Sequence, residues 1–264
     1  MDAKQGVKKM TVEKQIEIAV PIEAVWKALT NGVELSRWFP LEAHVEPGVG
    51  GKISVSWGPE SEGTAPIDAW EPNRRLQWTQ SVAGQPIVIE FTLESRGGKT
   101  VVRIIQSSFA TGADWEDGYF GSTDYGWGFM LVNLRHYLER HTGVPRMVAW
   151  PRFNVPMTRK TVYERLAAPV DIFVDGAQTL RAGEPYSLRT AFGEIWSGRV
   201  QFIAAPRGFC VSVESLNDAL AWLTIEGSGS EHDAQMWFST YGLPRVRVDE
   251  IEKEWAGELR RILR

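Results

Sequence analysis

Few side chains in this sequence have the type and spacing that catalysis or metal binding requires. The four histidines, His44, His136, His141 and His232, form neither an H-x3-H pair nor an H-E-x-x-H motif. His136 and His141 are five residues apart, so on a helix they would not share a face well. Cys210 follows Phe209 in an apolar run with no histidine nearby, which is typical of a buried, inert thiol. We therefore expect no metal site and no cofactor.

Motifs that bind phosphate or activate a nucleophile are also missing from the sequence. It has no G-x-S-x-G turn, no phosphate-binding loop with its terminal Lys, and no G-x-G-x-x-G after a strand. The stretch 118–128 is rich in glycine and aromatic residues but contains no lysine. No catalytic residue can be assigned on this basis.

Two opposite charges, Glu90 and Arg103, could lie close together, because they flank a Gly97-Gly98 hairpin turn. Inside a cavity, such a pair could orient a polar ligand or act as acid and base. However, Glu90 is out of phase with the apolar Ile89 and Phe91, which places it on the opposite face of its strand. We expect an exposed cross-strand ion pair.

Aromatic side chains are the strongest candidates for a binding site, since the chain has 12 Trp, 11 Phe and 6 Tyr. Large rings either fill a core or line a cavity, and both interpretations stay open here. The residues that could line a pocket between a sheet and a helix are Trp38, Phe39, Trp57, Trp70, Trp78, Phe91, Trp127 and Met130.

The acidic and aromatic stretch 114–119 adds two more candidates, Trp115 and Tyr119. It could form the mouth of the pocket, with both rings touching the ligand. Alternatively, it is a loop followed by a first helical turn, where carboxylates favour the positive end of the helix dipole.

The order of predicted elements is that of an α+β fold, with strands run together rather than alternating with helices. Alternation of Ile87, Ile89, Phe91 and Leu93 with Val88, Glu90 and Thr92 indicates a half-buried antiparallel strand. From about 123 to 141 the apolar residues recur at helical spacing, so this helix would cover one face of the sheet. The earlier elements are a strand over 11–20, helices over 21–31 and 33–38, and strands over 52–57, 63–71, 75–81 and 100–107.

A second, degenerate copy of this order follows, because the pattern W-x3-L-x2-[LI] occurs at Trp127 and again at Trp255. We predict a complete first domain over 11–142, a proline-containing linker over 143–157 and a truncated second domain over 158–264. The elements of the second copy are a helix over 158–167, strands over 171–174, 187–190, 194–204, 208–214, 219–226 and 233–239, and a helix over 248–263. Its opening strand would be missing or very short.

Composition excludes several classes of partner. The net charge is −4, and no lysine or arginine cluster forms a footprint for nucleic acid. One cysteine cannot make an intramolecular disulfide, and no run of about 20 apolar residues could cross a bilayer. No apolar segment follows the basic N-terminus, so we expect a soluble cytoplasmic protein. The oligomeric state is not indicated.

Several short motifs in order resemble a known family. They cover about residues 11–142 and comprise Pro21-Ile22-x-x-Val25-Trp26, Leu35-x-x-Trp38-Phe39, Gly50-Gly51-Lys52-Ile53, Pro72-x-x-Arg75-Leu76 and Gly126-Trp127. Together they resemble homologues of the activator of heat-shock protein 90 ATPase, within the START-like (SRPBCC) superfamily with its helix-grip fold. The second copy matches less well, and its front half departs from the pattern.

The resemblance implies a curved antiparallel sheet that wraps a long C-terminal helix and encloses an apolar pocket. Superfamily members bind lipids, sterols, polyketides or plant hormones, and some are cyclases or hydratases. The implied function is therefore the binding of a small hydrophobic molecule. Two alternatives stay open: a co-chaperone that activates a heat-shock protein 90 ATPase in a stress response, and an enzyme acting on an apolar substrate.

Overall fold

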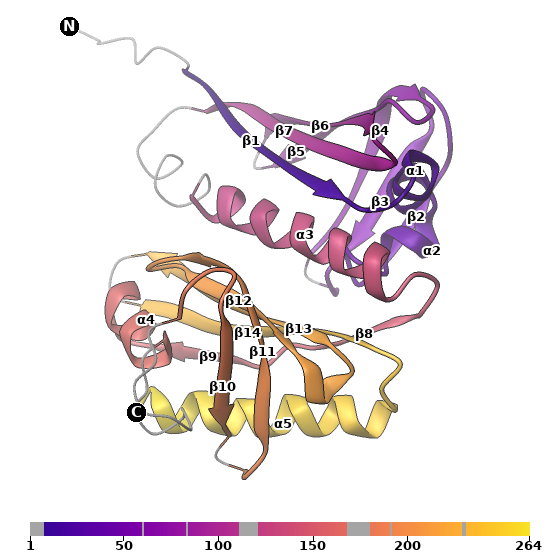
Figure 1. The fold of residues 1–264 in the computed structure, drawn as a ribbon. Coiled ribbons are helices and arrows are strands. Elements are labelled where there is room, and N and C mark those ends of the chain that lie inside the picture. Colours follow the sequence, from indigo (N-terminus) through magenta and orange to yellow (C-terminus); the bar gives the residue numbers. More distant parts are fainter. Residues whose placement is uncertain are drawn as a thin grey trace, which may run out of the picture. The chain divides into compact units, whose positions relative to one another are not determined.

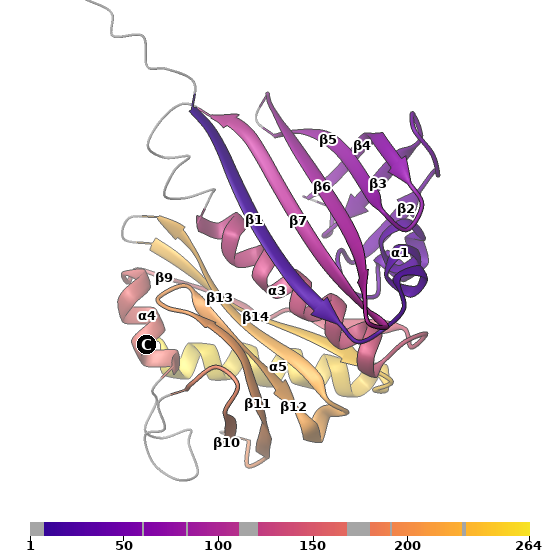
Figure 2. The same cartoon turned by 45° about the horizontal axis from the view of Figure 1, so that its top comes forward.

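Two units make up the chain, Met1–Gly143 and Val144–Arg264. In this computed structural model, the described residues are 8–59, 61–82, 84–110, 121–167, 180–190, 192–228 and 231–264. Each unit is a curved antiparallel sheet with a long C-terminal helix across one face, α3 in the first and α5 in the second (Figures 1 and 2). The predicted α+β class and the helix-grip arrangement in two copies are confirmed.

Unit 1 contains a sheet in the order β1-β7-β6-β5-β4-β3-β2. Its strands are β1 (Lys8–Ile18), β2 (Glu42–Val45), β3 (Lys52–Ser56), β4 (Glu62–Glu71), β5 (Arg75–Val82), β6 (Gln85–Arg96) and β7 (Lys99–Ala110). Between β1 and β2 lie the helices α1 (Ile22–Thr30) and α2 (Gly32–Leu35), and α3 (Gly121–Arg140) ends the unit.

The alternation over 87–93 gives β6 one apolar face, because Ile87, Ile89, Phe91 and Leu93 are buried while their neighbours are more accessible. Residues paired across antiparallel strands point to the same side, so this face continues onto β5 and β7. An apolar face must be covered, and α3 lies along it (Figure 1).

A half-buried polar cluster links α2 to the C-terminal part of α3. Glu34 accepts a hydrogen bond from the Tyr137 hydroxyl, and its Oε1 lies 3.1 Å from a nitrogen of Arg37 and 3.0 Å from Nζ of Lys27. Burial alone would raise the pKa of the Glu34 carboxyl, but the hydrogen bonds from Tyr137 and Lys27 and the charge of Arg37 outweigh burial and lower it. Glu34 is therefore a carboxylate that the folded state stabilises.

We expect this cluster to make stability depend on pH in the acid range. Because the folded-state pKa of Glu34 is lowered, its contribution is fully present above the ordinary value of 4.5 and is lost as the pH falls through the folded-state pKa. The free energy of unfolding of a Glu34→Gln variant, measured in urea from pH 7 to pH 3, should fall less steeply below pH 4.5 than that of the wild type. A Glu23→Gln variant, on the exposed side of α1, is the control. Parallel curves for wild type and Glu34→Gln would contradict the assignment.

Unit 2 repeats the layout with fewer elements. It contains β8 (Arg146–Ala149), β9 (Arg152–Val155), α4 (Arg159–Ala167), β10 (Pro185–Arg189), β11 (Ile195–Ala204), β12 (Gly208–Val213), β13 (Ala219–Ser228), β14 (Glu231–Tyr241) and α5 (Arg245–Ile262). A short 3-10 turn, Glu214–Leu216, joins β12 to β13. The sheet order is β10-β11-β12-β13-β14-β8, and β9 also pairs with β14.

The segment 143–157 is not the linker that the sequence predicts. Its strands β8 and β9 both pair antiparallel with β14, the last strand of unit 2, just as β1 pairs with β7 in unit 1. These two short strands are thus the opening strand that the second copy seemed to lack, interrupted at Trp150-Pro151 because proline cannot donate to a ladder. Unit 2 therefore begins at 144 rather than 158. The strand predicted over 171–174 lies outside the described residues.

The predicted ion pair between Glu90 and Arg103 is wrong, because each of them pairs with a different residue. Both side chains are on the outer face of the sheet. Across the hairpin, Glu90 faces Ile105 and Arg103 faces Thr92, so the two charges are offset by two residues along the strands. Glu90 instead lies 2.6 Å from Arg75 on β5, and Arg103 lies 2.7 Å from Glu13 on β1.

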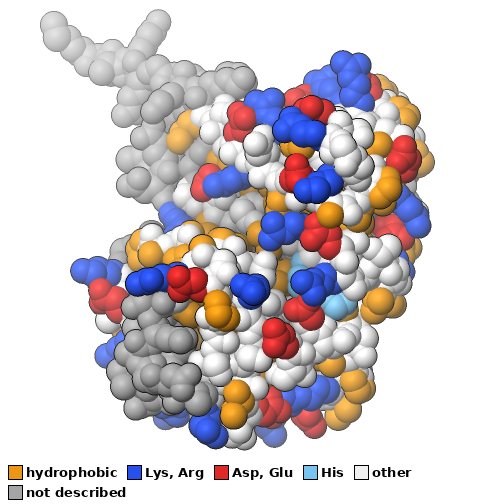
Figure 3. Space-filling view, viewed as in Figure 1, with side chains coloured by type: hydrophobic (Ala, Val, Ile, Leu, Met, Phe, Trp, Pro, Cys, Tyr) orange, Lys and Arg blue, Asp and Glu red, His pale blue; other side chains and the backbone are white. Residues whose placement is uncertain are grey.

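On the face shown in Figure 3, the Lys and Arg side chains alternate with Asp and Glu side chains, and neither sign gathers into one broad patch. Among the described helices, none combines the length and the apolar character needed to cross a membrane.

Candidate ligand-binding site

A cleft of about 320 Å³ lies in unit 1 between the N-terminal half of α3 and the inner face of the sheet. The sheet contributes side chains from β3, β5, β6 and β7, and the segment after α2 contributes Phe39. The described lining residues are Phe39, Val55, Trp57, Trp78, Gln80, Ile89, Gln106, Thr123, Gly126, Trp127 and Met130.

The helix presents one stripe of residues to this cleft. Thr123, Gly126, Trp127 and Met130 follow the spacing i, i+3, i+4, i+7, which places them on a single face of α3. Gly126 lies beside open space on that face of α3, because a Cβ built there meets no other atom within 4 Å. The open space of the cleft therefore depends on the absence of a side chain at this position.

Aromatic rings form the walls and hold one another in place. Phe39 stacks on Trp127, with centroids 5.3 Å apart and planes 15° apart, and meets Trp57 edge to face at 5.2 Å. The indole nitrogen of Trp127 donates to Oε1 of Gln106 at 2.7 Å. That hydrogen bond fixes both the indole plane and the amide of Gln106 on β7. Such rings offer large apolar contact area at little cost in conformational entropy.

Of the residues expected to contact a ligand, five line this cleft: Phe39, Trp57, Trp78, Trp127 and Met130. Trp38 and Phe91 lie deeper, with 0% and 2% of their surface exposed, and pack edge to face at 6.5 Å. They support the wall rather than form it. Trp115 and Tyr119 lie outside the described residues.

Trp70 is not part of the cleft wall. On β4 it pairs with Leu76, at the end of the sheet that α1 covers, and its ring meets Trp26 of α1 edge to face at 5.3 Å. The alternation of β4 and β5 places Trp70 on the inner face, but the position of α1 fills the space above it.

Sequence reasoning missed the polar residues of the cleft, Gln80, Gln106 and Thr123. The phase of the strands could have indicated Gln106, since Val102, Ile104 and Gln106 alternate on one side of β7. A polar residue that continues an apolar phase points toward the interior.

Among the described lining residues, no side chain carries a charge or titrates. Asp124, which follows the lining residue Thr123, pairs with Lys14 at 2.8 Å, and these two side chains are 52% and 33% exposed. The described wall thus offers apolar contact and neutral hydrogen bonding. None of its described side chains could act as a general acid or base.

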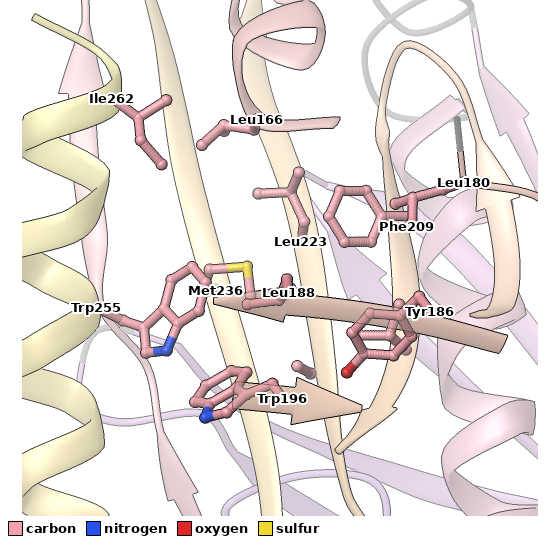
Figure 4. A pocket seen from close by; sticks show the side chains of 12 residues that line it. Leu166, Leu180, Tyr186, Leu188, Trp196, Phe209, Leu223, Met236, Trp255 and Ile262 are labelled. Atoms are coloured by element: carbon pink, nitrogen blue, oxygen red, sulfur yellow. The ribbon is translucent and has the colours of Figure 1, made fainter. Parts of the chain in front are cut away.

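Unit 2 contains a smaller, more enclosed cavity between α5, α4 and its own sheet (Figure 4). Its volume is about 40 Å³. The only hydroxyl in its described wall belongs to Tyr186, which donates to the carbonyl oxygen of Ser212 at 2.8 Å, and burial raises the pKa of this phenol. The lining residues are Leu166, Leu180, Tyr186, Leu188, Trp196, Phe209, Val211, Ala221, Leu223, Met236, Trp255 and Ile262.

The cleft of unit 1 and the cavity of unit 2 differ in volume. Pockets that hold drug-sized molecules have volumes of roughly 300–1,000 Å³, a range that includes the cleft of unit 1 and excludes the cavity of unit 2. In unit 2 the rings of Trp196 and Trp255 lie 5.0 Å apart and fill the space beside the helix. We therefore take the cleft of unit 1 as the candidate site.

Comparison with solved structures gives matches to half of the chain and to nearly all of it. A protein from Mesorhizobium loti, MLL2253, is 28% identical over 50% of this chain and 98% of its own, with a TM-score of 0.45. The Aha1 dimer from Colwellia psychrerythraea is 21% identical over 51% of this chain and 99% of its own, with a TM-score of 0.44. DynU16, a putative protein of the dynemicin biosynthetic locus, is 17% identical over 96% of both chains, with a TM-score of 0.44. No curated protein matches the sequence.

A comparison with protein families matches one family to residues 19–139, described as "Activator of Hsp90 ATPase homolog 1-like protein". The match begins just before α1 and ends within the last turn of α3, so it spans the elements that build the cleft. Residues 19–139 of this chain are thus similar to the family of Activator of Hsp90 ATPase homolog 1-like proteins.

Proposed function

We propose that unit 1 binds a small hydrophobic molecule in the cleft between α3 and the sheet. The observation that carries this proposal is a space of about 320 Å³ walled by Phe39, Trp57, Trp78, Trp127 and Met130. Apolar surface that stays in contact with water is costly, and a ligand that displaces this water gains roughly 25 cal/mol for each Å² buried.

Rigid walls favour this role over simple core packing. Phe39 stacks on the ring face of Trp127, and Gln106 accepts a hydrogen bond from the indole nitrogen of Trp127. A preformed pocket does not have to be ordered when a ligand enters, so less of the contact energy is spent on that step.

The proposal is tested by isothermal titration calorimetry against 2-acetylnaphthalene, 2-ethylnaphthalene and palmitate, with the protein in the syringe because these compounds dissolve poorly. We expect saturable one-to-one binding of at least one naphthalene. At a free ligand concentration 100 times its Kd, linkage adds about 2.7 kcal/mol to the free energy of unfolding, so the melting temperature should rise in parallel. Absence of both heat and thermal shift for every compound would refute the proposal.

A second candidate function is activation of a heat-shock protein 90 ATPase, which the name of the matched family favours. This role would place the protein in the cytoplasm with a chaperone as partner. The ATPase rate of a purified heat-shock protein 90, with and without a stoichiometric amount of this chain, tests it. A several-fold rise would support a co-chaperone, whereas an unchanged rate would leave ligand binding as the function.

A further inference from the structure

A second hollow in unit 1 lies on the face of the sheet that is turned away from α3 (Figure 1). We call it the outer groove. Its volume is about 350 Å³, and the polar residues that matter for its chemistry are Gln15, Arg74, Arg75, Thr92, Arg96 and Arg103. Glu94 is the one acidic residue of its described wall. Four arginines and one glutamate make this wall positive, although the whole chain has a net charge of −4.

The strand register explains why arginines from separate segments meet in this groove. One row of paired residues crosses β1, β7, β6 and β5 and consists of Gln15, Arg103, Thr92 and Arg75. Residues paired across antiparallel strands point to the same side of the sheet. Because neighbouring strands lie about 4.8 Å apart, Arg103 and Arg75 flank Thr92 at roughly 10 Å from each other. Two guanidinium groups can therefore approach a ligand above Thr92 from opposite sides.

Two further arginines bring positive charge to one end of this row. Arg74 lies in the turn before β5, and its carbonyl oxygen accepts from the backbone N–H of Leu93 on β6 at 2.9 Å. Arg96 is the last residue of β6, and it lies on the same face as Thr92 because the two are four residues apart in a strand. Both arginines line the outer groove.

Glutamates outside the groove pair with Arg103 and Arg74 but leave donors unused. Arg103 donates through Nε to Glu13 at 2.7 Å, and it makes no other hydrogen bond within the described part of the chain. One nitrogen of Arg74 lies 3.0 Å from the carboxylate of Glu71. A guanidinium has five N–H donors. Each of these arginines can therefore donate to a ligand and keep its glutamate.

The other two arginines are engaged to different degrees. Arg75 donates to Glu90 at 2.8 Å and to Gln77 at 2.7 Å, so it adds charge in a fixed place rather than free donors. Arg96 uses a single terminal nitrogen, which lies 3.2 Å from both carboxylate oxygens of Glu94. This bond directs one pair of charges along β6 and partly offsets the repulsion that Glu94 would exert on an anion.

Thr92 supplies a neutral donor at the centre of the row. It is half-buried, and its hydroxyl makes no hydrogen bond with the described residues. A hydroxyl between two cations can donate to an anionic oxygen, and such charge-assisted hydrogen bonds are stronger than neutral ones.

Phosphate oxygens fit this set of donors. The planar fork of a guanidinium matches the spacing of two phosphate oxygens, which makes arginine the preferred residue for phosphate recognition. Arginines on both sides of Thr92 and at one end of its row suit a ligand with more than one phosphate group. A long polyanion or an anionic membrane would also meet the carboxylates of Glu13 and Glu17 on the same face of β1, so a small molecule is favoured.

We propose that the outer groove of unit 1 binds a small soluble molecule that carries two or more phosphate groups, with Arg103, Arg74 and Arg96 donating to it over Thr92. This site lies on the opposite face of the sheet from the cleft, so it is independent of the proposed function.

The proposal is tested by calorimetric titration of the full chain with inorganic triphosphate at low ionic strength. We expect saturable one-to-one binding that weakens as sodium chloride is added, because salt screens partly exposed charges. Arg103→Gln should weaken the binding about five- to tenfold, the effect of losing a hydrogen bond to a charged group. Thr92→Val, which keeps the shape of the side chain, should weaken it about two- to fivefold.

Lys99→Gln is the matched control for Arg103→Gln. Lys99 lies on the same strand and pairs with Glu17 of β1 at 2.7 Å, as Arg103 pairs with Glu13 at 2.7 Å, but it does not line the outer groove. Both variants remove one positive charge and one ion pair. The control should therefore change the affinity for triphosphate by less than about twofold.

Three results would overturn the proposal. The first is the absence of heat with triphosphate, or an equal loss of affinity in Arg103→Gln and Lys99→Gln. The second is binding of citrate as tightly as triphosphate, which would show that any multiple anion suffices. The third is co-sedimentation with vesicles of phosphatidylcholine and phosphatidylinositol 4,5-bisphosphate that Arg103→Gln abolishes, which would assign the groove to a lipid surface instead of a soluble molecule.

Discussion

Replacing Gly126 by leucine should weaken the binding of 2-acetylnaphthalene at least about tenfold, a loss of about 1.4 kcal/mol or more. Gly126 belongs to the stripe of α3 that lines the cleft, and a Cβ at this position meets no other atom within 4 Å. The leucine side chain would therefore enter space that the ligand requires rather than displace the protein. Calorimetric titration of the variant measures the effect.

Gly128→Leu is the matched control for this substitution. Gly128 lies on the same helix, a Cβ there also meets nothing within 4 Å, and the residue does not line the cleft. Both substitutions should stabilise the helix by up to about 1 kcal/mol, because glycine is a poor helix former. A difference in affinity between the two variants thus reports on the cleft alone. Unchanged affinity in Gly126→Leu would mean that the ligand binds elsewhere.

Replacing Trp38 by alanine should lower the free energy of unfolding by about 3–5 kcal/mol, the usual cost of removing a fully buried large aromatic side chain. Trp38 is 0% exposed, and its indole nitrogen donates to the carbonyl oxygen of Ala28 at 2.9 Å. The substitution opens a cavity beside Phe39 and Phe91 and also leaves that carbonyl oxygen without its donor. Urea denaturation followed by circular dichroism measures the change.

Trp26→Ala serves as the comparison for Trp38→Ala. Trp26 is only half-buried and meets Trp70 at the edge of the α1 packing. Its removal takes away less buried area and should cost clearly less. An equal or larger loss for Trp26 would show that α1, rather than the layer around Trp38, limits the stability of unit 1.

Periodicity predicted the elements that are long and half-buried. β6 has one apolar phase, and α3 and α5 have tryptophans at equivalent places, so Trp127 and Trp255 both lie buried on the helix that covers their own sheet. These patterns depend on local spacing, which the sequence displays directly.

Short strands and pairing partners were not predictable in the same way. β8 and β9 have four residues each and are separated by Pro151, so neither is long enough to show alternation. They form because β14 offers an unpaired edge far away in sequence. The partner of Glu90 likewise depends on register, which the turn at Gly97-Gly98 sets to place Thr92 opposite Arg103.

The aromatic side chains of the candidate site could be predicted from the sequence. Trp57, Trp78 and Trp127 follow from the apolar phase of their elements. Trp70 shares that phase, and only the packing of Trp26 of α1 against it shows that it is not available to a ligand. The open volume of the cleft could not be predicted, because it depends on the absence of a side chain at Gly126.

Whether the cleft of unit 1 binds a ligand is tested most directly by a crystal structure of the full chain with 6-bromo-2-acetylnaphthalene, in which anomalous scattering locates the bromine without reference to the protein density. We predict one peak in the cleft, within about 5 Å of the rings of Trp57 or Trp127, as expected for packed apolar groups. A peak between Trp196 and Trp255 in unit 2, or no ordered bromine in crystals soaked to saturation, would contradict ligand binding in this cleft.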